Sequence, residues 1–203
     1  EIFYSLQGEG KYTGYPFLFI RFAKCNLRCR FCDTEYSFEQ GTEIDIKDII
    51  KEIEKYTNIP HILLTGGEPL IQKEGLLILI DKLIQIRKKV VLETNGTYDL
   101  SEIPKKVRKV IDMKTPGSGH GDSFLISNLN YFFPKDEMKF IILDRKDFDY
   151  SLNFVKNNGL IGRNILFSPV FGQLSPKTLS QWILAERLPI KLNLQIHKVV
   201  GIK

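Results

Sequence analysis

The chain has 203 residues, of which 43% are hydrophobic and 26% are charged, as in an ordinary globular protein with one sizeable core. No stretch approaches the roughly 20 apolar residues that a membrane span requires, so we expect no membrane association. The formal net charge of +5 is mild, and the lysines are spread over predicted helix faces rather than concentrated in one arm. We therefore expect a single domain over residues 1–203 that does not bind nucleic acid directly.

Short apolar runs alternate with amphipathic stretches along the whole chain. In chain order we predict a strand at residues 16–22, a helix at 45–56, a strand at 61–64, a helix at 75–87, strands at 90–93, 107–113 and 138–143, a helix at 146–157, a strand at 164–167, a helix at 176–187 and a strand at 190–195. Four isoleucines share one face of the first helix: Ile46, Ile49, Ile50 and Ile53.

This alternation is typical of parallel β/α units with right-handed crossovers. A complete eight-fold barrel takes about 250 residues. We therefore expect an α/β fold with a mostly parallel sheet, built as a partial, incomplete β/α barrel of about six or seven strands. A doubly wound sheet is the alternative, because the sequence does not show whether the sheet closes. In either fold, ligands bind at the carboxyl ends of the strands.

Polar, glycine-bearing segments follow the predicted strands one after another. The cysteines follow the first strand, and later strands are followed by residues 65–69, 93–96, 112–116, 168–172 and 197–198. Because the carboxyl ends of parallel strands meet at one edge of a sheet, we expect these segments to surround one site.

The three cysteines, Cys25, Cys29 and Cys32, lie within eight residues. An odd number at such short spacing is a poor disulfide framework, and with no export signal it indicates a metal or redox site in a reducing cytoplasm. A cubane iron–sulfur cluster takes four thiolates, so three would leave one iron with an open position. A zinc site, with a distant histidine as the fourth ligand, and inert cysteines are the alternatives.

The spacing Cys25-x3-Cys29-x2-Cys32 resembles the hallmark of the radical S-adenosylmethionine superfamily, in which an aromatic residue such as Phe31 usually precedes the third cysteine. The resemblance implies that the three cysteines hold a [4Fe–4S] cluster. It also implies that the open iron binds the amino and carboxylate groups of S-adenosylmethionine, whose reductive cleavage gives a 5′-deoxyadenosyl radical. The Thr-Gly-Gly-Glu-Pro segment at residues 65–69 resembles the second motif of that superfamily, where backbone and Glu68 would grip the methionine ammonium.

Three more segments resemble the 7-carboxy-7-deazaguanine synthase family: residues 4–10 (Tyr-Ser-Leu-Gln-Gly-Glu-Gly), residues 21–27 and residues 32–34. The resemblance continues to residues 194–198. That family rearranges 6-carboxy-5,6,7,8-tetrahydropterin to 7-carboxy-7-deazaguanine with loss of ammonia, on the route to tRNA deazapurines such as queuosine and archaeosine. The resemblance implies a carbon–nitrogen lyase that uses Mg²⁺, takes electrons from a donor such as flavodoxin or ferredoxin, and works as a homodimer.

The same resemblance assigns roles residue by residue. The pterin would meet Leu6, Gln7, Gly8, Glu9, Arg21, Thr65, His197 and the terminal carboxylate of Lys203. S-adenosylmethionine would meet Phe31, Cys32, Asp33, Gly67, Glu68, Asp112, Met113, Lys114, Ser168, Pro169, Val170 and Phe171. The hydroxyl of Thr34 would ligate Mg²⁺. At residues 112–114 the family more often reads Ser-Pro-Lys, so only Lys114 matches there.

Residue chemistry alone leaves other interpretations open. Arg21 lies in an apolar strand and needs a partner, which could be a substrate carboxylate or a protein acid in a structural salt bridge. Residues 7–10 could form a simple turn, and Cys-Asp-Thr could be a helix N-cap. His197 could be a satisfied hydrogen-bonding residue. For the whole chain, the alternatives are a glycyl-radical-enzyme activating enzyme, which needs neither residues 7–10 nor Cys-Asp-Thr, and a zinc-binding RNA-interaction module.

Overall fold

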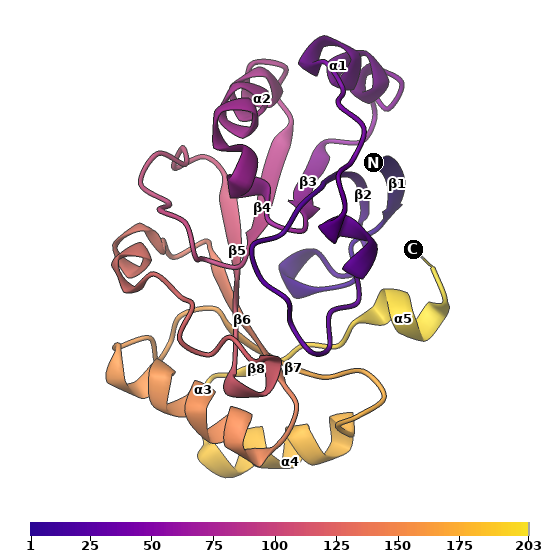
Figure 1. Cartoon of the computed structure of the whole chain (residues 1–203). Coiled ribbons are helices and arrows are strands. Elements are labelled where there is room, and N and C mark those ends of the chain that lie inside the picture. The colour runs from indigo at the N-terminus through magenta and orange to yellow at the C-terminus, as the bar shows by residue number, and fades with distance from the viewer. Residues whose placement is uncertain (203) are drawn as a thin grey trace.

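The strands of the sheet lie side by side in chain order, from β1 to β8, in a computed structural model that describes residues 1–202. β1 runs antiparallel to β2, and all later neighbours are parallel. The strands are β1 (Ile2–Leu6), β2 (Pro16–Phe22), β3 (His61–Gly66), β4 (Lys89–Thr94), β5 (Arg108–Met113), β6 (Glu137–Ile142), β7 (Ile165–Pro169) and β8 (Lys191–Leu192). The curved sheet with β1 and β8 as its edges is a partial barrel (Figure 1).

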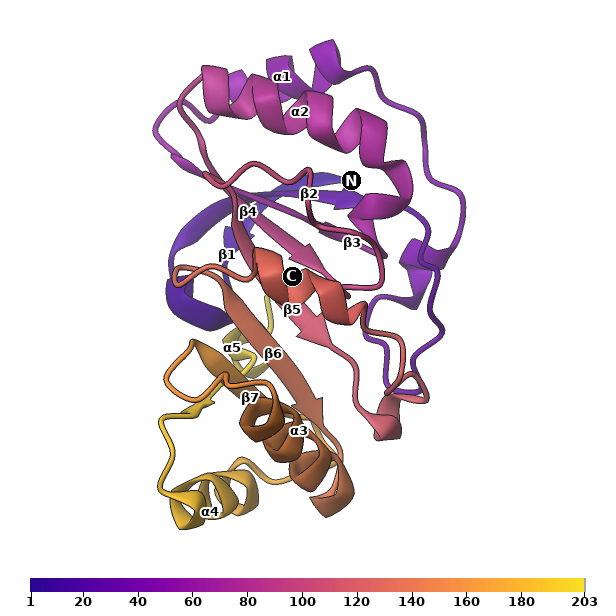
Figure 2. The same cartoon turned by 90° about the vertical axis from the view of Figure 1, so that its left-hand side faces the viewer.

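Four helices cover the outer face of the curved sheet, two on each half (Figure 2). They are α1 (Ile46–Glu54), α2 (Lys73–Gln85), α3 (Arg145–Asn157) and α4 (Pro176–Glu186), and a short α5 (Ile196–Val200) follows β8. Single 3₁₀ turns lie in the loops: η1 (Gly10–Tyr12), η2 (Glu35–Phe38), η3 (Pro69–Gln72), η4 (Pro116–Ser118) and η5 (Ile126–Tyr131). In the described part of the chain, no helix combines the length and the apolar character that a membrane span requires.

Side-chain caps explain where two of these helices begin. The Asp45 carboxylate accepts the Lys47 backbone N–H at 2.8 Å at the start of α1. The Asp144 carboxylate accepts the Asp147 N–H at 3.0 Å at the start of α3. Each cap satisfies a backbone donor that has no partner within the helix.

The predicted partial β/α barrel is confirmed, and the doubly wound alternative is wrong, because a doubly wound sheet reverses its strand order and this one does not. The count of six or seven strands was too low, because β1 was not predicted. β1 is a short edge strand that joins β2 through a hairpin, so β/α alternation gives no signal for it. The last strand is shorter than the predicted 190–195, and α5 was not predicted.

Two apolar clusters flank the sheet. The larger one packs the outer helices against the strands and includes Leu64, Leu76, Ile111 and Phe148. The smaller one, here called the inner cluster, lies on the concave face and consists of Phe17, Phe19, Leu63, Val91 and Val110, with Phe3 and Tyr12 packed against it. Since one sheet carries both clusters, the fold supports our proposal of a single domain over residues 1–203.

A close backbone approach at the end of β3 fixes the cysteine loop next to the Gly-Gly turn. Gly66 has φ +141°, and a Cβ on it would lie 2.2 Å from the carbonyl oxygen of Phe22 at the end of β2. A Cβ on Gly67 would lie 2.1 Å from the carbonyl oxygen of Lys24. Only glycine therefore lets β3 pass this close to the chain that leads into Cys25.

We expect Gly66→Ala to lower the free energy of unfolding by about 2–3 kcal/mol, because the new methyl group meets backbone that cannot move aside. The matched control is Gly75→Ala in α2, where a Cβ meets nothing within 4 Å. The control should gain about 0.5–1 kcal/mol. Urea unfolding measures both values, and equal losses in the two variants would contradict the prediction.

Candidate active site

A cavity of about 530 Å³ opens at the carboxyl ends of the strands. Its wall includes most of the predicted site residues: Leu6, Gln7, Gly8, Glu9, Arg21, Cys25, Cys29, Phe31, Cys32, Asp33, Thr34, Thr65, Gly67, Asp112, Lys114, Val170, Phe171 and His197. Four others do not line it: Glu68, Met113, Ser168 and Pro169. Lys203 lies outside the described residues. The expected gathering of the loop segments at one edge is therefore confirmed.

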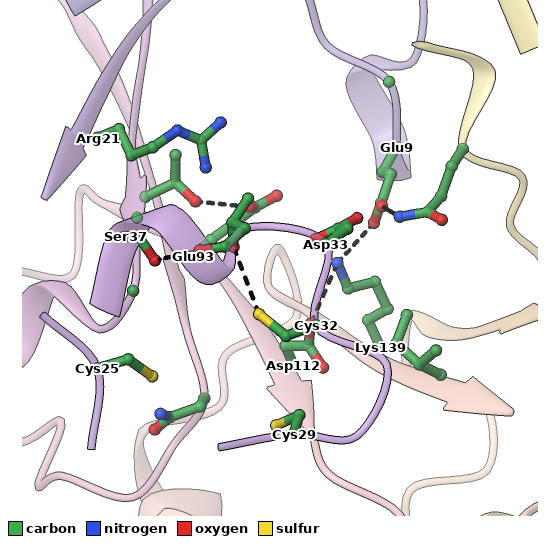
Figure 3. Close-up of a pocket in the computed structure, with 18 of the residues that line it drawn as sticks. Glu9, Arg21, Cys25, Cys29, Cys32, Asp33, Ser37, Glu93, Asp112 and Lys139 are labelled. Carbon is green, nitrogen blue, oxygen red and sulfur yellow. Dashed lines mark hydrogen bonds and ion pairs between the residues drawn. The ribbon is translucent and has the colours of Figure 1, made fainter. Parts of the chain in front are cut away.

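The three cysteines surround one part of this cavity as free, half-buried thiols (Figure 3). Arg28 organises their loop, because its guanidinium donates to the carbonyl oxygens of Cys25 and Leu27, both at 2.8 Å. Leu27 anchors the loop from below, with only 7% of its surface exposed. The buried Leu27 side chain and the charge-assisted bonds of Arg28 thus fix the conformation of the cysteine loop.

The donor set fits a cubane with one open iron. The chain has three cysteines and all of them line this cavity, whereas a cubane binds each thiolate on a different iron and has four irons. Burial raises the pKa of the Cys25 and Cys29 thiols, and the nearby Lys114 ammonium opposes that shift. Gly67 brings the Gly-Gly turn against the backbone before Cys25, since a Cβ on it would lie 2.1 Å from the Lys24 carbonyl oxygen and 2.9 Å from the Cys25 Cβ.

Glu68 is fully buried and holds the end of β4 in place. Its Oε1 accepts the Leu70 N–H at 3.0 Å and the Thr94 hydroxyl at 2.8 Å, and its Oε2 accepts the Asn95 N–H at 2.7 Å. Burial raises the pKa of this carboxyl, and the three donors oppose the shift. The carboxylate therefore positions the Gly-Gly turn from behind the cavity wall.

Lys139 of β6 is the centre of a charged network inside the barrel. Its ammonium lies 2.6 Å from Oε2 of Glu9 and 3.3 Å from Oδ2 of Asp112 (Figure 3). Lys114 also pairs with Asp112, at 2.9 Å. Burial disfavours the charge on Lys139, but Glu9, Asp112 and Glu93 outweigh it and hold its pKa well above the usual value. Sequence reasoning missed Lys139, although a lysine in the apolar run of residues 138–143 is the same signal that singled out Arg21.

Glu93 at the end of β4 is the second residue that sequence reasoning left without a role. It lines the cavity and accepts the Thr65 hydroxyl at 3.0 Å. Burial raises the pKa of its carboxyl, Lys139 opposes the shift, and Glu9 adds to it. Glu93 can therefore accept or share a proton with a bound ligand.

Arg21 lies across the cavity from the charged network, on β2 next to Thr65 of β3 (Figure 3). Its Nε lies 3.4 Å from a Glu1 carboxylate oxygen, and its guanidinium packs over the Phe3 and Tyr36 rings at 5.4 and 5.7 Å. The buried Nε makes no hydrogen bond within the described residues. The guanidinium is therefore held in place and still able to take a carboxylate.

The segments at 7–10 and 193–198 form the remaining wall together. The Ile196 N–H donates to the Gly8 carbonyl at 3.0 Å, and Gln195 donates to Glu9 at 2.7 Å. A Cβ on Gly8 would lie 1.8 Å from Nδ1 of His197. Residues 7–10 are therefore not only a turn, because they bind residues 193–198. His197 lines the cavity.

The Cys-Asp-Thr run does not cap a helix with its side chains. The Thr34 hydroxyl lies 3.7 Å from the Cys32 sulfur, and no side-chain bond caps the short η2 that follows it. Asp33 pairs with Lys198 at 2.6 Å, which ties the cysteine loop to α5. Burial would raise the pKa of the Asp33 carboxyl, but the bond from Lys198 lowers it below its usual value.

Replacing Glu93 should stabilise the ligand-free chain in a pH-dependent way. The pKa of Glu93 is higher in the folded chain than in the unfolded chain, where it is about 4.3. Ionised Glu93 therefore lowers the free energy of unfolding at pH values above about 4.3. Glu93→Gln should therefore raise Tm at pH 7, and the gain should shrink as the pH falls toward 4. The exposed Glu54→Gln on α1 controls for the change in net charge. A lower Tm for Glu93→Gln at pH 7 would contradict the prediction.

Comparisons with known proteins support the reading of these motifs. The family model described as the Radical SAM superfamily matches residues 19–120. The 7-carboxy-7-deazaguanine synthase of Koribacter versatilis is 38% identical over 98% of this chain and 95% of its own length. The enzyme of the same name from Chlorobaculum tepidum is 36% identical over 98% of this chain and 92% of its own length.

Solved structures agree in fold. The crystal structure of QueE from Escherichia coli superposes with a TM-score of 0.74 at 22% identity, over 96% of this chain and 92% of that one. Streptococcus suis SuiB bound to S-adenosylmethionine superposes with a TM-score of 0.60 at 12% identity, over 87% of this chain and 49% of that one. With the cysteine triplet, the family match and these near-full-length relatives in agreement, the chain belongs to the radical SAM superfamily and, within it, to the 7-carboxy-7-deazaguanine synthase family.

Proposed function

We propose that the chain converts 6-carboxy-5,6,7,8-tetrahydropterin to 7-carboxy-7-deazaguanine with loss of ammonia, as a carbon–nitrogen lyase. The observation that carries this proposal is the composition of one cavity, which has three cysteines on one side and the Arg21 cation and Glu93 carboxylate elsewhere in its wall. When bound, the iron–sulfur cluster and S-adenosylmethionine would supply the abstraction of a hydrogen atom from the substrate. The chain's own residues would bind, orient and shield the reacting groups.

The cofactor site is proposed along the cysteine side of the cavity. Gly67 lies against the backbone next to Cys25 and lines the cavity there, and the cation of Lys114 suits a negatively charged group. Val170 and the exposed ring of Phe171 offer apolar surface for a purine ring. Other proposed contacts are Phe31, Asp33 and Asp112, while Glu68, Met113, Ser168 and Pro169 would support the wall from behind.

The substrate site is proposed between Arg21 and Glu93. A guanidinium pairs with a carboxylate through two parallel hydrogen bonds, which suits the 6-carboxylate of the pterin. The half-buried Glu93 lines this cavity, and its ionised carboxylate would accept from the adjacent N–H donors of an aminopyrimidine edge. Other residues that line the cavity would complete the recognition of the substrate: Leu6, Gln7, Gly8, Glu9, Thr65 and His197.

Magnesium is proposed at the Thr34 hydroxyl. A single hydroxyl is a poor site for Mg²⁺, which prefers carboxylates, phosphates and water. Thr34 lines the same cavity as Arg21, so a substrate carboxylate between them would supply the missing oxygen ligands. The ion would then help Arg21 to hold the substrate.

Partners and location also follow as proposals. The free thiols suit a reducing compartment such as the cytoplasm. The exposed cations Lys24 and Arg30 beside the cysteines suit an acidic one-electron donor such as a flavodoxin or ferredoxin. A homodimer is proposed from the family resemblance.

Anaerobic turnover tests the proposed reaction. The reconstituted protein, given S-adenosylmethionine, Mg²⁺, a reductant and carboxytetrahydropterin, should form 7-carboxy-7-deazaguanine and ammonia in equal amounts. Mass analysis identifies the product. Cofactor cleavage without any deazaguanine product would refute the assigned substrate while leaving the radical chemistry intact.

Arg21→Ala should raise KM for the pterin by roughly ten- to hundredfold, because a charge-assisted carboxylate contact is lost. Cofactor cleavage in the absence of substrate should stay unchanged. Arg145→Ala on the exposed face of α3 is the matched control and should leave KM unchanged. If Arg21→Ala lowers Tm and leaves KM unchanged, Arg21 forms only a structural salt bridge.

A further inference from the structure

A second pocket lies at the other end of the barrel, where β4, β5 and β6 begin. It has a volume of about 320 Å³, and Arg87, Lys88, Lys89, Lys106, Arg108 and Lys135 line it together with Tyr12, Ile84, Val90 and Val91. The six cations come from three separate loops, and the lining includes no carboxylate. The whole chain has a formal net charge of +5, which is less than the charge of these six cations. The rest of the chain is therefore not net positive.

Four of the six cations make no ion pair or side-chain hydrogen bond with the described residues 1–202. Lys88 donates to the carbonyl oxygens of Tyr56 and Ile59, and Lys135 donates to the carbonyl of Lys105. The ion pairs of the described residues do not include the other four: Arg87, Lys89, Lys106 and Arg108. Arg108 lies over the Tyr12 ring at 5.5 Å, which fixes its guanidinium at the pocket.

Asp136, which follows Lys135 in the sequence, has partners outside the pocket lining. Asp136 pairs with the fully buried Lys109 at 2.8 Å and accepts the backbone N–H groups of Lys109 and Phe133. The pocket therefore keeps its positive field. Burial lowers the pKa of Lys135, and Lys109 and Arg108 lower it further against the effect of Asp136. Like charges held this close repel one another, and a bound anion would remove that repulsion.

The inner cluster separates this pocket from the active site. Phe19 and Leu63 of that cluster line the active-site cavity, here called the upper cavity. Val91 and Tyr12, which packs against the cluster, line the second pocket, here called the lower pocket. β4 carries Lys89 at its start and leads to Asn95 in the upper cavity, a span of roughly 20 Å for six residues. The lower pocket is therefore a separate site from the upper cavity.

We propose that this pocket binds the polyphosphate group of a small molecule. Arginine forks and lysine ammonium groups match phosphate oxygens, and four free cations match the charge of about −4 on a triphosphate. A volume of about 320 Å³ falls in the range of small-molecule sites, which favours a compact ligand over a nucleic-acid backbone. Tyr12 at the pocket wall offers an aromatic face beside it.

The proposal is tested by calorimetry on the full chain with two probes, inorganic tripolyphosphate and ATP, in about 0.15 M salt with EDTA. We expect one binding site per chain. Lys89→Gln with Arg108→Gln should weaken binding by at least tenfold. Lys47→Gln with Lys177→Gln, on the exposed faces of α1 and α4, removes the same charge and should leave the affinity within about twofold.

The two probes distinguish the sources of the phosphate group. Equal affinities indicate that the pocket binds the polyphosphate group alone, and tighter binding of ATP indicates that it also binds the nucleoside; both results support the proposal. Absence of binding, equal losses in the two double variants, or binding of an RNA oligonucleotide in place of both probes would overturn it. Pterin turnover without added phosphate should be the same in both double variants, so this test stands apart from the proposed reaction.

Discussion

The segments that follow β1 and β8, not hydrogen bonds between these two strands, close the open side of this partial barrel. β1 and β8 are the edges of the sheet, and the gap between them is bridged by the ion pair of Glu9 with Lys139 and by the bond from Gln195 to Glu9. The Gly10 N–H adds a bond of 2.8 Å to the Asn193 side chain. Because these groups are buried and paired, the interior stays polar at one end without leaving an isolated charge.

This arrangement divides the inside of the barrel into three zones. The upper zone holds the cysteines, Arg21 and the charged network; the middle zone is the inner apolar cluster; and the lower zone is the cationic pocket. The apolar middle zone keeps the two charged ends apart. A radical reaction at the upper end is thereby shielded from the lower one, since neither water nor ions pass a packed aromatic cluster readily.

Much of the fold followed from local pattern. The parallel strands and the four outer helices have strong apolar periodicity, and the cysteine spacing identified the superfamily. β1 and α5 were not predicted because each is short and neither is part of a β/α repeat. Lys139 and Gln195 were missed because their roles depend on Glu9, which lies 130 and 186 residues away. The cationic pocket was not predicted either, because its residues are dispersed along the chain and come together only in the fold.

The contact of Gly8 with His197 has a consequence for how the site comes into being. Gln7 has local partners in Gly14 and Tyr15, but Gly8, Glu9 and the Gly10 N–H gain Ile196, Gln195 and Asn193 as partners only after residues 193–198 have been synthesised. During translation the outer helices and central strands can pack first, since their contacts are local. The reactive cavity is then the last part to form, so a nascent chain carries its cysteines without a finished pocket around them.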